Sequence, residues 1–600
     1  MSMAVDRRRA GSLVPAATPN ALLAAVLVGL AALLMLPVSV PIGPMYWDLF
    51  IYFDAAQRIF DGQVPVIDFF TPVGPLGYYL FALGLALFPD AQPLLLVHWS
   101  LLAVTAPAMA LVLHALARDG RQGTALALLV PFLVFAVLPF NTREFYPYPG
   151  SDGFGIYNRQ VCQLLYVLVA ALVFVRGQRL LAALVAVLMA ALFFTKVTGF
   201  VSGLVLCGFA FLAGRIAFGW AAAAAAAFLA LLAGLELSAG LVSHYVGDIL
   251  ALVAMNSGSL APRFLQAASH TFGIVAAAGL LMLVLLYGER RTLAADLAAL
   301  ARRPRPAALA RLVDRPALWI GVVLFAGILF ETQNTGSQAL IFLWPVLLPV
   351  LAGLPRPAGP RTAAVAVLIA AAALPPLVNT VEKAARTYAG ALKTVPLPGD
   401  NLKTLGRVSV RPEMLQRAER MRGFYAEHRA TYEALIETGA LPAFLLYSDF
   451  DFQALHLMTI DAAVARIRAL EAETGARAET VLALNFVNPF PWLLARSAPR
   501  HVAIGADPMR AVPDPGADEL AAVGATDLVL HPTCPVTTAN AALRRLYAPA
   551  LADHTTIALT PCYDAYVHPR LAGALTGAAR QDAAASPAEG LRLVSDQPDM

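Results

Sequence analysis

Long apolar segments follow one another through the first 380 residues of the chain. Each is about 15–26 residues long and holds few charged side chains, as expected of an α-helix that crosses a lipid bilayer. We expect about eleven membrane-spanning helices, and the predicted spans cover residues 20–40, 92–117, 124–140, 159–175, 180–195, 197–214, 218–240, 267–287, 317–331, 338–354 and 362–379. The first of them is too long for the apolar core of a signal peptide.

After residue 380 the pattern changes. A helical region over 412–439 is followed by short apolar segments that alternate with helical ones. The predicted strands are FLLYS, TVLALNF, HVAIG, TDLVLHP and TTIALTP. This alternation predicts an α/β domain over 381–575, followed by a disordered tail at 576–600. The fold class is therefore a multi-pass α-helical membrane protein with a C-terminal soluble α/β domain. Since no glycine-rich phosphate loop follows a strand, a nucleotide site is not indicated.

Composition narrows the class of protein. Hydrophobic residues make up 59% of the chain and charged residues only 14%, and the mean hydropathy is +0.68. These values exclude a soluble globular protein. The net charge of +4 comes from arginine clusters between apolar segments, not from a basic stripe with interleaved aromatic residues. We therefore expect a lipid bilayer as a partner, and no nucleic acid.

Charged residues on the connections predict the orientation. One set of connections carries Arg7 to Arg9 and a basic run from Arg290 to Arg315, and the other set is acidic. By the positive-inside rule, residues 1–19 and the basic connections face the cytoplasm of a bacterial inner membrane. An odd number of spans over 20–380 then places the domain at 381–575 in the periplasm.

Two of the four cysteines, Cys534 and Cys562, lie in the predicted outer domain. In an oxidising compartment they could form a disulfide, and the alternative is two unpaired thiols of a cytosolic domain. Cys162 and Cys207 lie inside apolar segments. Because no metal-ligand spacing links the four, no metal site is predicted.

The first outer loop, residues 41–91, mixes aromatic residues with carboxylates. It is predicted to form two helices at the membrane surface, separated by the segment Gly62 to Pro65. Asp48 lies among aromatic residues that would exclude water and raise its pKa, which suits a general base acting on an acceptor hydroxyl. The alternative is that Asp48 caps the N-terminus of the helix that follows.

The string WDLFIYFDAAQRIFDG in this loop resembles the first-loop motif of the GT-C glycosyltransferases, which include the protein O-mannosyltransferases and the lipid A aminoarabinose transferases. A second string, VIDFFTPVGPLGYY, resembles the continuation of that motif. The matching positions are Asp48, Tyr52, Ala56, Gly62, Pro75, Leu76 and Tyr78. Where the aminoarabinose transferases have a lysine, this chain has Val73, so no lipid-phosphate contact is implied at that position.

The resemblance implies a GT-C-like fold and a glycosyltransferase activity. The enzyme would move a hexosyl or pentosyl group from a polyprenyl-phosphate sugar to a cell-envelope acceptor (a lipid, a glycan or a protein) on the periplasmic face. The sugar lipid is a substrate and no cofactor is implied. Asp48 is followed by Leu49, so no D-x-D pair supports a divalent metal. A multispan transporter or flippase of envelope lipids or glycans is the alternative, and an inactive scaffold is a third reading.

The family also has an acidic residue in the second outer loop, which corresponds to residues 141–160 here. The resemblance therefore implies Asp152 as a second catalytic carboxylate, with Glu144 next in order. The alternative for Asp152 is a turn residue in the segment PGSDG. Tyr52 and Asp68 are predicted to position the substrate, and the alternative for Asp68 is a structural role.

A phosphate group on the donor requires cations, and the candidates are Lys196, Arg159 and Arg263. Lys196 stands where the two short spans at 180–195 and 197–214 meet, and its alternative is a side chain that snorkels to the interface. Arg159 could instead form a salt bridge with Asp152.

Overall fold

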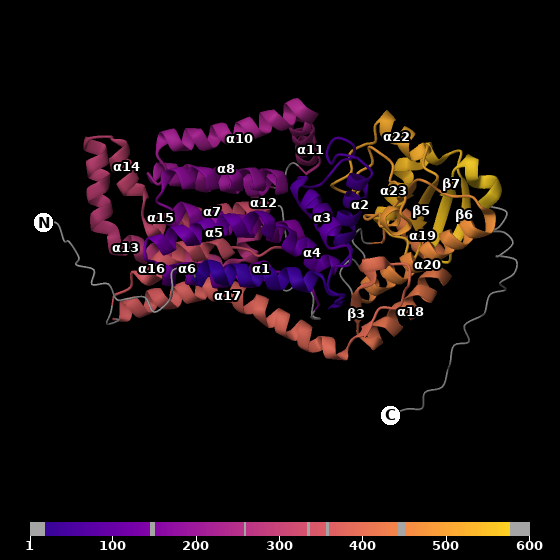
Figure 1. The fold of residues 1–600 in the computed structure, drawn as a ribbon, viewed down its shortest axis with the longest axis horizontal. Coiled ribbons are helices and arrows are strands. Elements are labelled where there is room, and N and C mark those ends of the chain that lie inside the picture. The colour runs from indigo at the N-terminus through magenta and orange to yellow at the C-terminus, as the bar shows by residue number, and fades with distance from the viewer. Residues whose placement is uncertain are drawn as a thin grey trace.

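The computed structural model describes residues 18–143, 150–256, 260–332, 336–355, 359–441 and 450–575. Figure 1 shows a bundle of long helices at one end of the molecule and an α/β domain at the other. Three predictions lie outside the described residues, namely a role for Glu144, the strand FLLYS and the tail at 576–600.

Each predicted span falls on a helix of the bundle. These helices are α1 (Thr18–Leu34), α4 (Pro93–Ser100) with α5 (Leu102–Arg118), α6 (Gln122–Val137), α7 (Ile156–Phe174), α8 (Gln178–Thr195), α9 (Val197–Leu212), α10 (Phe218–Ala239), α13 (Phe272–Arg302), α15 (Pro316–Glu331), α16 (Trp344–Ala352) and α17 (Pro360–Gly390). Three further helices connect them, α11 (Leu241–Asn256), α12 (Leu260–His270) and α14 (Pro306–Val313). Helix α14 lies within the basic run from Arg290 to Arg315, so this connection is partly helical.

The helices of the bundle differ in whether they are long enough to cross a membrane. Among the described residues, five helices are long and apolar enough to cross a membrane, and the number rises to seven if the bent pairs α4–α5 and α14–α15 each count as one span. The others are apolar helices of 10–17 residues. The structure thus supports a membrane protein with several apolar helices, while the count of eleven stays a prediction. Helix α7 is the centre of the bundle, whereas α10 and α13 are mostly exposed, as lipid-facing helices would be.

The first outer loop forms two helices, α2 (Asp48–Phe60) and α3 (Leu76–Leu87), and the break after Phe60 is confirmed. Helix α2, however, does not lie open on a membrane surface. Its aromatic side chains pack against the α/β domain, with the Phe53 and Trp492 rings 5.1 Å apart and the Trp47 and Phe486 rings 5.2 Å apart. Ten of its residues are buried, including Asp48. Trp47 and Phe53 thus join the first outer loop to the α/β domain.

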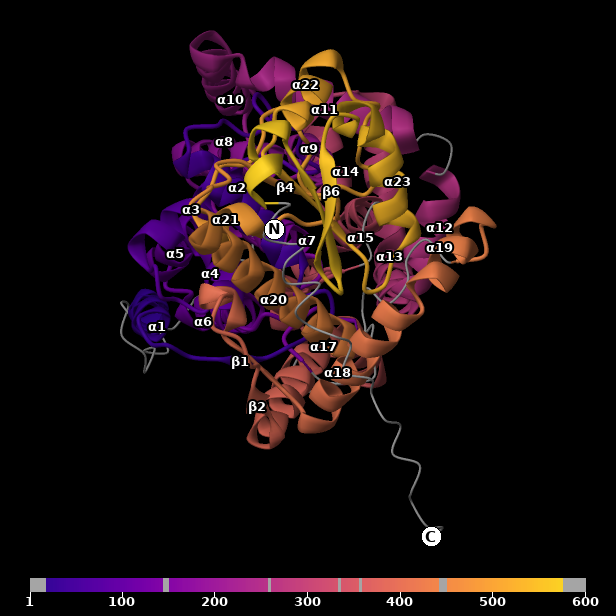
Figure 2. The same cartoon turned by 90° about the vertical axis from the view of Figure 1, so that its right-hand side faces the viewer.

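The α/β domain contains a four-stranded sheet in the order β4 (Val481–Ala483), β5 (Leu528–Pro532), β7 (Tyr563–Val567) and β6 (Thr555–Thr560). Strands β4 and β5 are parallel and the other pairs are antiparallel. Its helices are α18 (Pro412–Glu427), α19 (Arg429–Glu437), α20 (Phe450–Thr474), α21 (Phe490–Leu494), α22 (Ala517–Gly524) and α23 (Thr538–Tyr547). Figure 2 views this domain from the side away from the bundle.

Three of the predicted strands are confirmed, since TVLALNF, TDLVLHP and TTIALTP contain β4, β5 and β6. The prediction of a strand in HVAIG is wrong. This segment has no regular structure, and the backbone amide of Ile504 donates to the carbonyl of Phe70 in the first outer loop at 3.1 Å. The segment is apolar because it is buried against another part of the chain. Strand β7 was not predicted.

Polar contacts fasten the α/β domain to the first outer loop. The buried Arg58 pairs with Asp54 at 2.9 Å and donates to the carbonyl of Pro499 at 2.6 Å. Gln63 donates to the carbonyl of Ala498 at 2.9 Å. A second, small sheet also joins the two parts, in the order β1 (Val40–Pro41), β3 (Val408–Val410) and β2 (Val395–Pro396). The loop is therefore held between the bundle and the domain.

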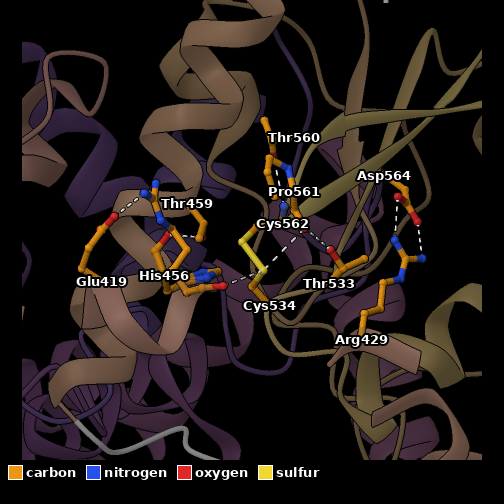
Figure 3. Close-up of a disulfide and its surroundings, with 11 residues drawn as sticks. Glu419, Arg429, His456, Thr459, Thr533, Cys534, Thr560, Pro561, Cys562 and Asp564 are labelled. Carbon is orange, nitrogen blue, oxygen red and sulfur yellow. Dashed lines mark hydrogen bonds and ion pairs between the residues drawn. A yellow bond between two sulfur atoms is a disulfide. The ribbon is translucent and has the colours of Figure 1, made fainter. Parts of the chain in front are cut away.

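Cys534 and Cys562 form a disulfide, with a Cα–Cα separation of 4.9 Å (Figure 3). The bond joins the segment after β5 to the turn between β6 and β7. Beside it, Arg429 of α19 donates two hydrogen bonds to Asp564, at 2.9 and 2.6 Å. Of the two alternatives for this cysteine pair, the structure has the disulfide.

Candidate functional site

A cavity of about 580 Å³ lies where the bundle, the first outer loop and the α/β domain meet. Valine and leucine side chains from α9, α11 and α15 line one part of it. Its charged side chains are Asp48, Lys196, Asp248, Arg263, Asp507 and Arg510, and Tyr52 and Asn158 are among the polar ones. An apolar wall beside a cluster of cations suits a ligand with a hydrocarbon chain and an anionic head.

Asp48 begins α2 and lines this cavity. Its side chain does not cap the helix, and Oδ1 makes no hydrogen bond to any described residue. Burial raises the pKa of Asp48 to about 7, although the Gly155 amide and the guanidinium groups of Arg510 and Arg159 partly oppose this shift. A carboxyl group with such a pKa and an uncommitted oxygen can accept a proton near neutral pH. The helix-cap alternative for Asp48 is therefore not what the structure shows.

Tyr52 lies one turn beyond Asp48 and lines the same cavity, because residues four apart share a helix face. Its ring packs against Tyr78 of α3, with the centroids 5.3 Å apart. Both tyrosines occur in the first-loop motif. They form a rigid aromatic wall next to the carboxyl group of Asp48.

Lys196 lies at the junction of α8 and α9, where its extended backbone interrupts the helices. Its ammonium group donates to Asn158 Oδ1 at 3.1 Å and lies 4.7 Å from the centre of the Tyr157 ring. The first outer loop reaches this junction too, since the amide of Gly74 donates to the carbonyl of Thr195 at 3.1 Å. A Cβ atom at Gly74 would lie 2.2 Å from the Phe194 carbonyl oxygen, so only glycine permits this approach. The lysine is thus directed inward and does not snorkel.

Two arginines from separate parts of the chain complete the cations of the cavity. Arg263 belongs to α12, and Arg510 belongs to the α/β domain. Arg263 was a candidate from sequence, whereas Arg510 was missed. The short string ADPMR around Arg510 has no motif that could have revealed it.

Asp248 of α11 was also missed as a cavity residue. It accepts a hydrogen bond from the amide of Thr71 at 3.4 Å and lines the same cavity. The sequence showed it only as one carboxylate of an outer connection. Its contact with Thr71 ties α11 to the first outer loop.

A second cavity, of about 500 Å³, adjoins the first. Arg263, Thr332 and Arg510 line both cavities. The second cavity extends between α12, α13, α15 and α17, and its further polar residues include Arg143, Gln266 and His270. Two spaces therefore meet at a shared pair of arginines.

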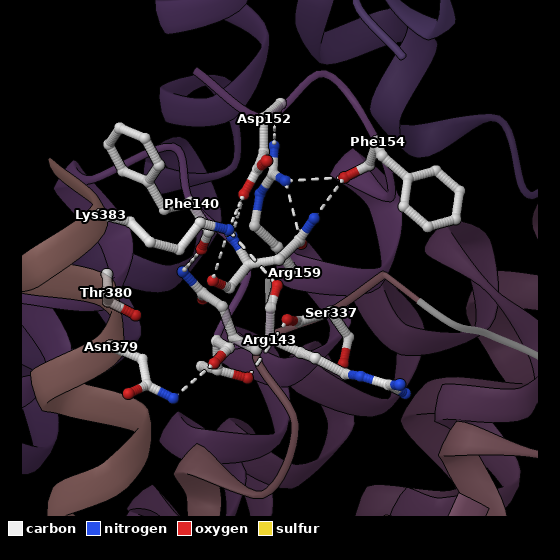
Figure 4. A network of polar contacts seen from close by, with 12 residues as sticks. Phe140, Arg143, Asp152, Phe154, Arg159, Ser337, Asn379, Thr380 and Lys383 are labelled. Carbon is white, nitrogen blue, oxygen red and sulfur yellow. Dashed lines mark hydrogen bonds and ion pairs between the residues drawn. The ribbon is translucent and has the colours of Figure 1, made fainter. Parts of the chain in front are cut away.

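Asp152 and Arg159 do not lie with the described residues that line either cavity. The Asp152 carboxylate pairs with Lys383 of α17 at 2.8 Å and accepts from the amide of Asn141 at 2.7 Å (Figure 4). Arg159 donates to the backbone carbonyls of Asp152 and Phe154, at 2.9 and 2.7 Å, and so does not pair with the carboxylate. This network holds the second outer loop in place, which favours a structural role for both residues.

Asp68 is likewise placed away from the described lining of the cavities. Its carboxylate accepts from the amide of Val64 at 2.7 Å and pairs with Arg500 of the α/β domain at 3.0 Å. It fastens the loop to the domain, which fits the structural alternative for this residue. In the described ranges, no group of three or more His, Cys, Asp or Glu side chains could hold a metal ion.

Comparison with known proteins gives few matches. No protein-family model and no curated protein sequence matches the chain. Two solved structures of ArnT from Cupriavidus metallidurans resemble it, one in the apo state and one bound to undecaprenyl phosphate. Each is 13% identical and covers 92% of this chain and 98% of its own, with TM-scores of 0.36 and 0.35. At these TM-scores the likeness carries no argument about the site, so the roles of the cavity residues depend on their own geometry.

Proposed function

We propose that this protein is a GT-C-type glycosyltransferase that moves a sugar from a polyprenyl-phosphate donor to a cell-envelope acceptor at the periplasmic face of the inner membrane. The observation that carries the proposal is the cavity in which Asp48, with an uncommitted oxygen, shares the lining with the cations Lys196 and Arg263. A base and a set of cations in one cavity are the two elements that such a transfer requires.

In the proposed reaction, the acceptor hydroxyl gives its proton to the Asp48 carboxylate as its oxygen bonds to the anomeric carbon of the sugar. The bond between that carbon and the phosphate oxygen breaks, and its electron pair stays on the polyprenyl phosphate. The attack comes from the face opposite the leaving phosphate, so the anomeric configuration inverts. Because negative charge increases on the phosphate, Lys196 and Arg263 stabilise the transition state more than the ground state.

The two adjoining cavities fit a reaction with two substrates. The apolar wall of the larger one, with Val201, Leu252 and Val253, suits the hydrocarbon chain of the donor. The second cavity meets it at Arg263 and gives the acceptor a separate approach to the same sugar. A flippase needs one path for one lipid, and this arrangement therefore favours transfer over transport.

Two observations support the proposed orientation. The disulfide between Cys534 and Cys562 is a feature of proteins in oxidising compartments. In Figure 1, α13 and α14, which carry the basic run, lie at the end of the bundle opposite the α/β domain. Cytoplasmic connections are rich in arginine, so the domain at the other end would be periplasmic.

Reconstitution into proteoliposomes tests the proposal against the flippase alternative. With polyprenyl-phosphate sugars as donors and an extract of envelope lipids and glycans as acceptors, we expect free polyprenyl phosphate and a new glycosidic bond in equal amounts, measured by mass spectrometry. An Asp61→Asn variant, changed at an exposed carboxylate just after α2, is a matched control that should behave as wild type. Movement of the lipid across the bilayer without a new glycosidic bond would refute the transferase.

Turnover is expected to depend on pH through Asp48. The carboxylate form is the base, and burial raises the pKa of this group to about 7. Turnover at saturating substrate should therefore rise with pH, reach half of its maximum near pH 7, and fall about tenfold for each pH unit below that value. A profile that stays flat between about pH 5 and 8 would contradict a base with this pKa.

A further inference from the structure

We propose that Arg510, a residue of the α/β domain, binds the phosphate of the donor and so completes the site across the contact between domain and bundle. This inference rests on the proposed function, and it identifies a phosphate contact outside the membrane helices. It also gives the α/β domain a direct part in the reaction.

The position of Arg510 suits a contact with the donor phosphate. Its side chain lines both cavities, as Arg263 does, and so it stands where the two spaces meet. Its charge reaches Asp48 in the first cavity, because Arg510 lowers the pKa of that carboxyl group. A phosphate held between Arg510 and Arg263 would present the sugar at the meeting point, within reach of an acceptor in the second cavity.

Neighbouring residues hold Arg510 in a defined place. Its Nε donates to Asp507 Oδ2 at 2.7 Å, and Asp507 Oδ1 accepts from the amide of Met509 at 3.0 Å. Its backbone carbonyl accepts from Asn256 of α11 at 3.0 Å. The side chain of Asp507 is buried, whereas that of Arg510 is 63% exposed. An arginine presents five N–H donors, and the contact with Asp507 uses the one on Nε.

The segment around Arg510 packs against the first outer loop. The amide of His501 donates to the carbonyl of Asp68 at 2.5 Å, and Ile504 donates to Phe70 as described above. Gly505 has a φ of +59°, and a Cβ atom there would lie 3.2 Å from Ile51 of α2 and 3.3 Å from Pro72. These contacts fix the segment against the loop that carries Asp48. The contact between the α/β domain and the first outer loop therefore positions both Asp48 and Arg510.

The chemistry of the residue fits this role. A guanidinium group matches the geometry of phosphate oxygens and keeps its charge at any physiological pH. Asp507 orients the guanidinium group through the contact at Nε. Because the side chain of Arg510 is largely exposed while that of Asp507 is buried, the carboxylate neutralises the arginine only in part. Asp507 is thus a positioning residue for Arg510.

Binding of undecaprenyl phosphate to the full-length protein in lipid nanodiscs tests the inference, with undecaprenol as the uncharged probe. For Arg510→Gln we expect a roughly 10- to 100-fold weaker Kd for undecaprenyl phosphate, which is the effect of losing charged hydrogen bonds, and an unchanged Kd for undecaprenol. Arg510→Lys should recover part of the loss, and Asp507→Asn should give an intermediate loss. Arg477→Gln, at an exposed ion pair with Glu479 in the same domain, should match wild type. An Arg510→Gln protein that binds both lipids like wild type would overturn the inference.

A pH profile separates this role from a purely structural one. Arg510 lowers the pKa of Asp48, so its removal should move the acidic limb of turnover to higher pH. The other charged or titratable groups that line this cavity or act on Asp48 are Tyr52, Tyr78, Tyr157, Arg159, Lys196, Tyr245, Asp248, Arg263 and Asp507. They are unchanged in the variant. Failure of the two proposals can be told apart, because normal turnover in Asp48→Asn refutes the proposed reaction, whereas an unshifted limb and an unchanged Kd in Arg510→Gln refute only the role of Arg510.

Discussion

Replacing Asp48 by asparagine is expected to lower turnover by roughly 100- to 10,000-fold, the range that a general base contributes. The amide keeps the shape of the side chain but cannot take the proton of the acceptor hydroxyl. Binding of undecaprenyl phosphate should change little, because the cations that hold it are intact. The measurement is the rate of formation of the new glycosidic bond at saturating donor, together with the Kd for undecaprenyl phosphate.

Stability provides the control for this variant. A buried carboxyl whose pKa is raised binds its proton more tightly in the folded protein than in the unfolded chain, so ionisation of Asp48 destabilises the fold as pH rises from about 4 toward 7. The Asp48→Asn protein should therefore unfold at a temperature no lower than that of wild type at pH 8, while Asp61→Asn retains full turnover. Equal turnover in Asp48→Asn and wild type would remove Asp48 from the mechanism.

Replacing Lys383 by methionine is expected to destabilise the protein by about 3–5 kcal/mol, the effect of leaving one member of a buried ion pair without its partner. The Asp152 carboxylate would keep its hydrogen bond from Asn141 and the charge of the nearby Arg159, but it would lose its ion pair in a place that is shielded from water. Chemical or thermal unfolding in detergent micelles measures the change. Lys393→Met, at an exposed lysine just after α17, should have little effect.

The double variant Asp152→Asn with Lys383→Met distinguishes the two roles considered for Asp152. If the pair is structural, removing both charges should cost less stability than the sum of the single changes, since residues in contact are coupled, and a folded double variant should retain turnover. Loss of turnover in an Asp152→Asn protein of normal stability would instead restore Asp152 as a catalytic residue.

Local features of the sequence were enough to place Asp48, Tyr52 and Lys196. Asp48 and Tyr52 are four residues apart on one helix, so helical geometry alone puts them on a common face. Lys196 interrupts two apolar helices, and a charge at such a place is costly unless it serves a purpose. These three residues line the same cavity.

Contacts between distant segments could not be read in this way. Asp152 and Lys383 form an ion pair although they are hundreds of positions apart in sequence. Arg510 and Asp48, which line the same cavity, are separated by a similar distance along the chain. The sequence around these residues has no motif that reveals the contact. An aspartate in a turn has the same sequence context whether its carboxylate contacts a substrate or a lysine. The HVAIG segment was misread for the same reason, since burial against another loop and burial in a sheet both select apolar residues.

The sequence by itself determined that this is a membrane protein with many apolar helices, an acidic first outer loop and an α/β domain after residue 380, because length, hydropathy and charge act locally along the chain. Only the tertiary structure decided which charged groups share the cavity. That choice depends on how the first outer loop is held between bundle and domain, and the contacts that hold it, such as Arg58 with Pro499, form between segments that are far apart in sequence.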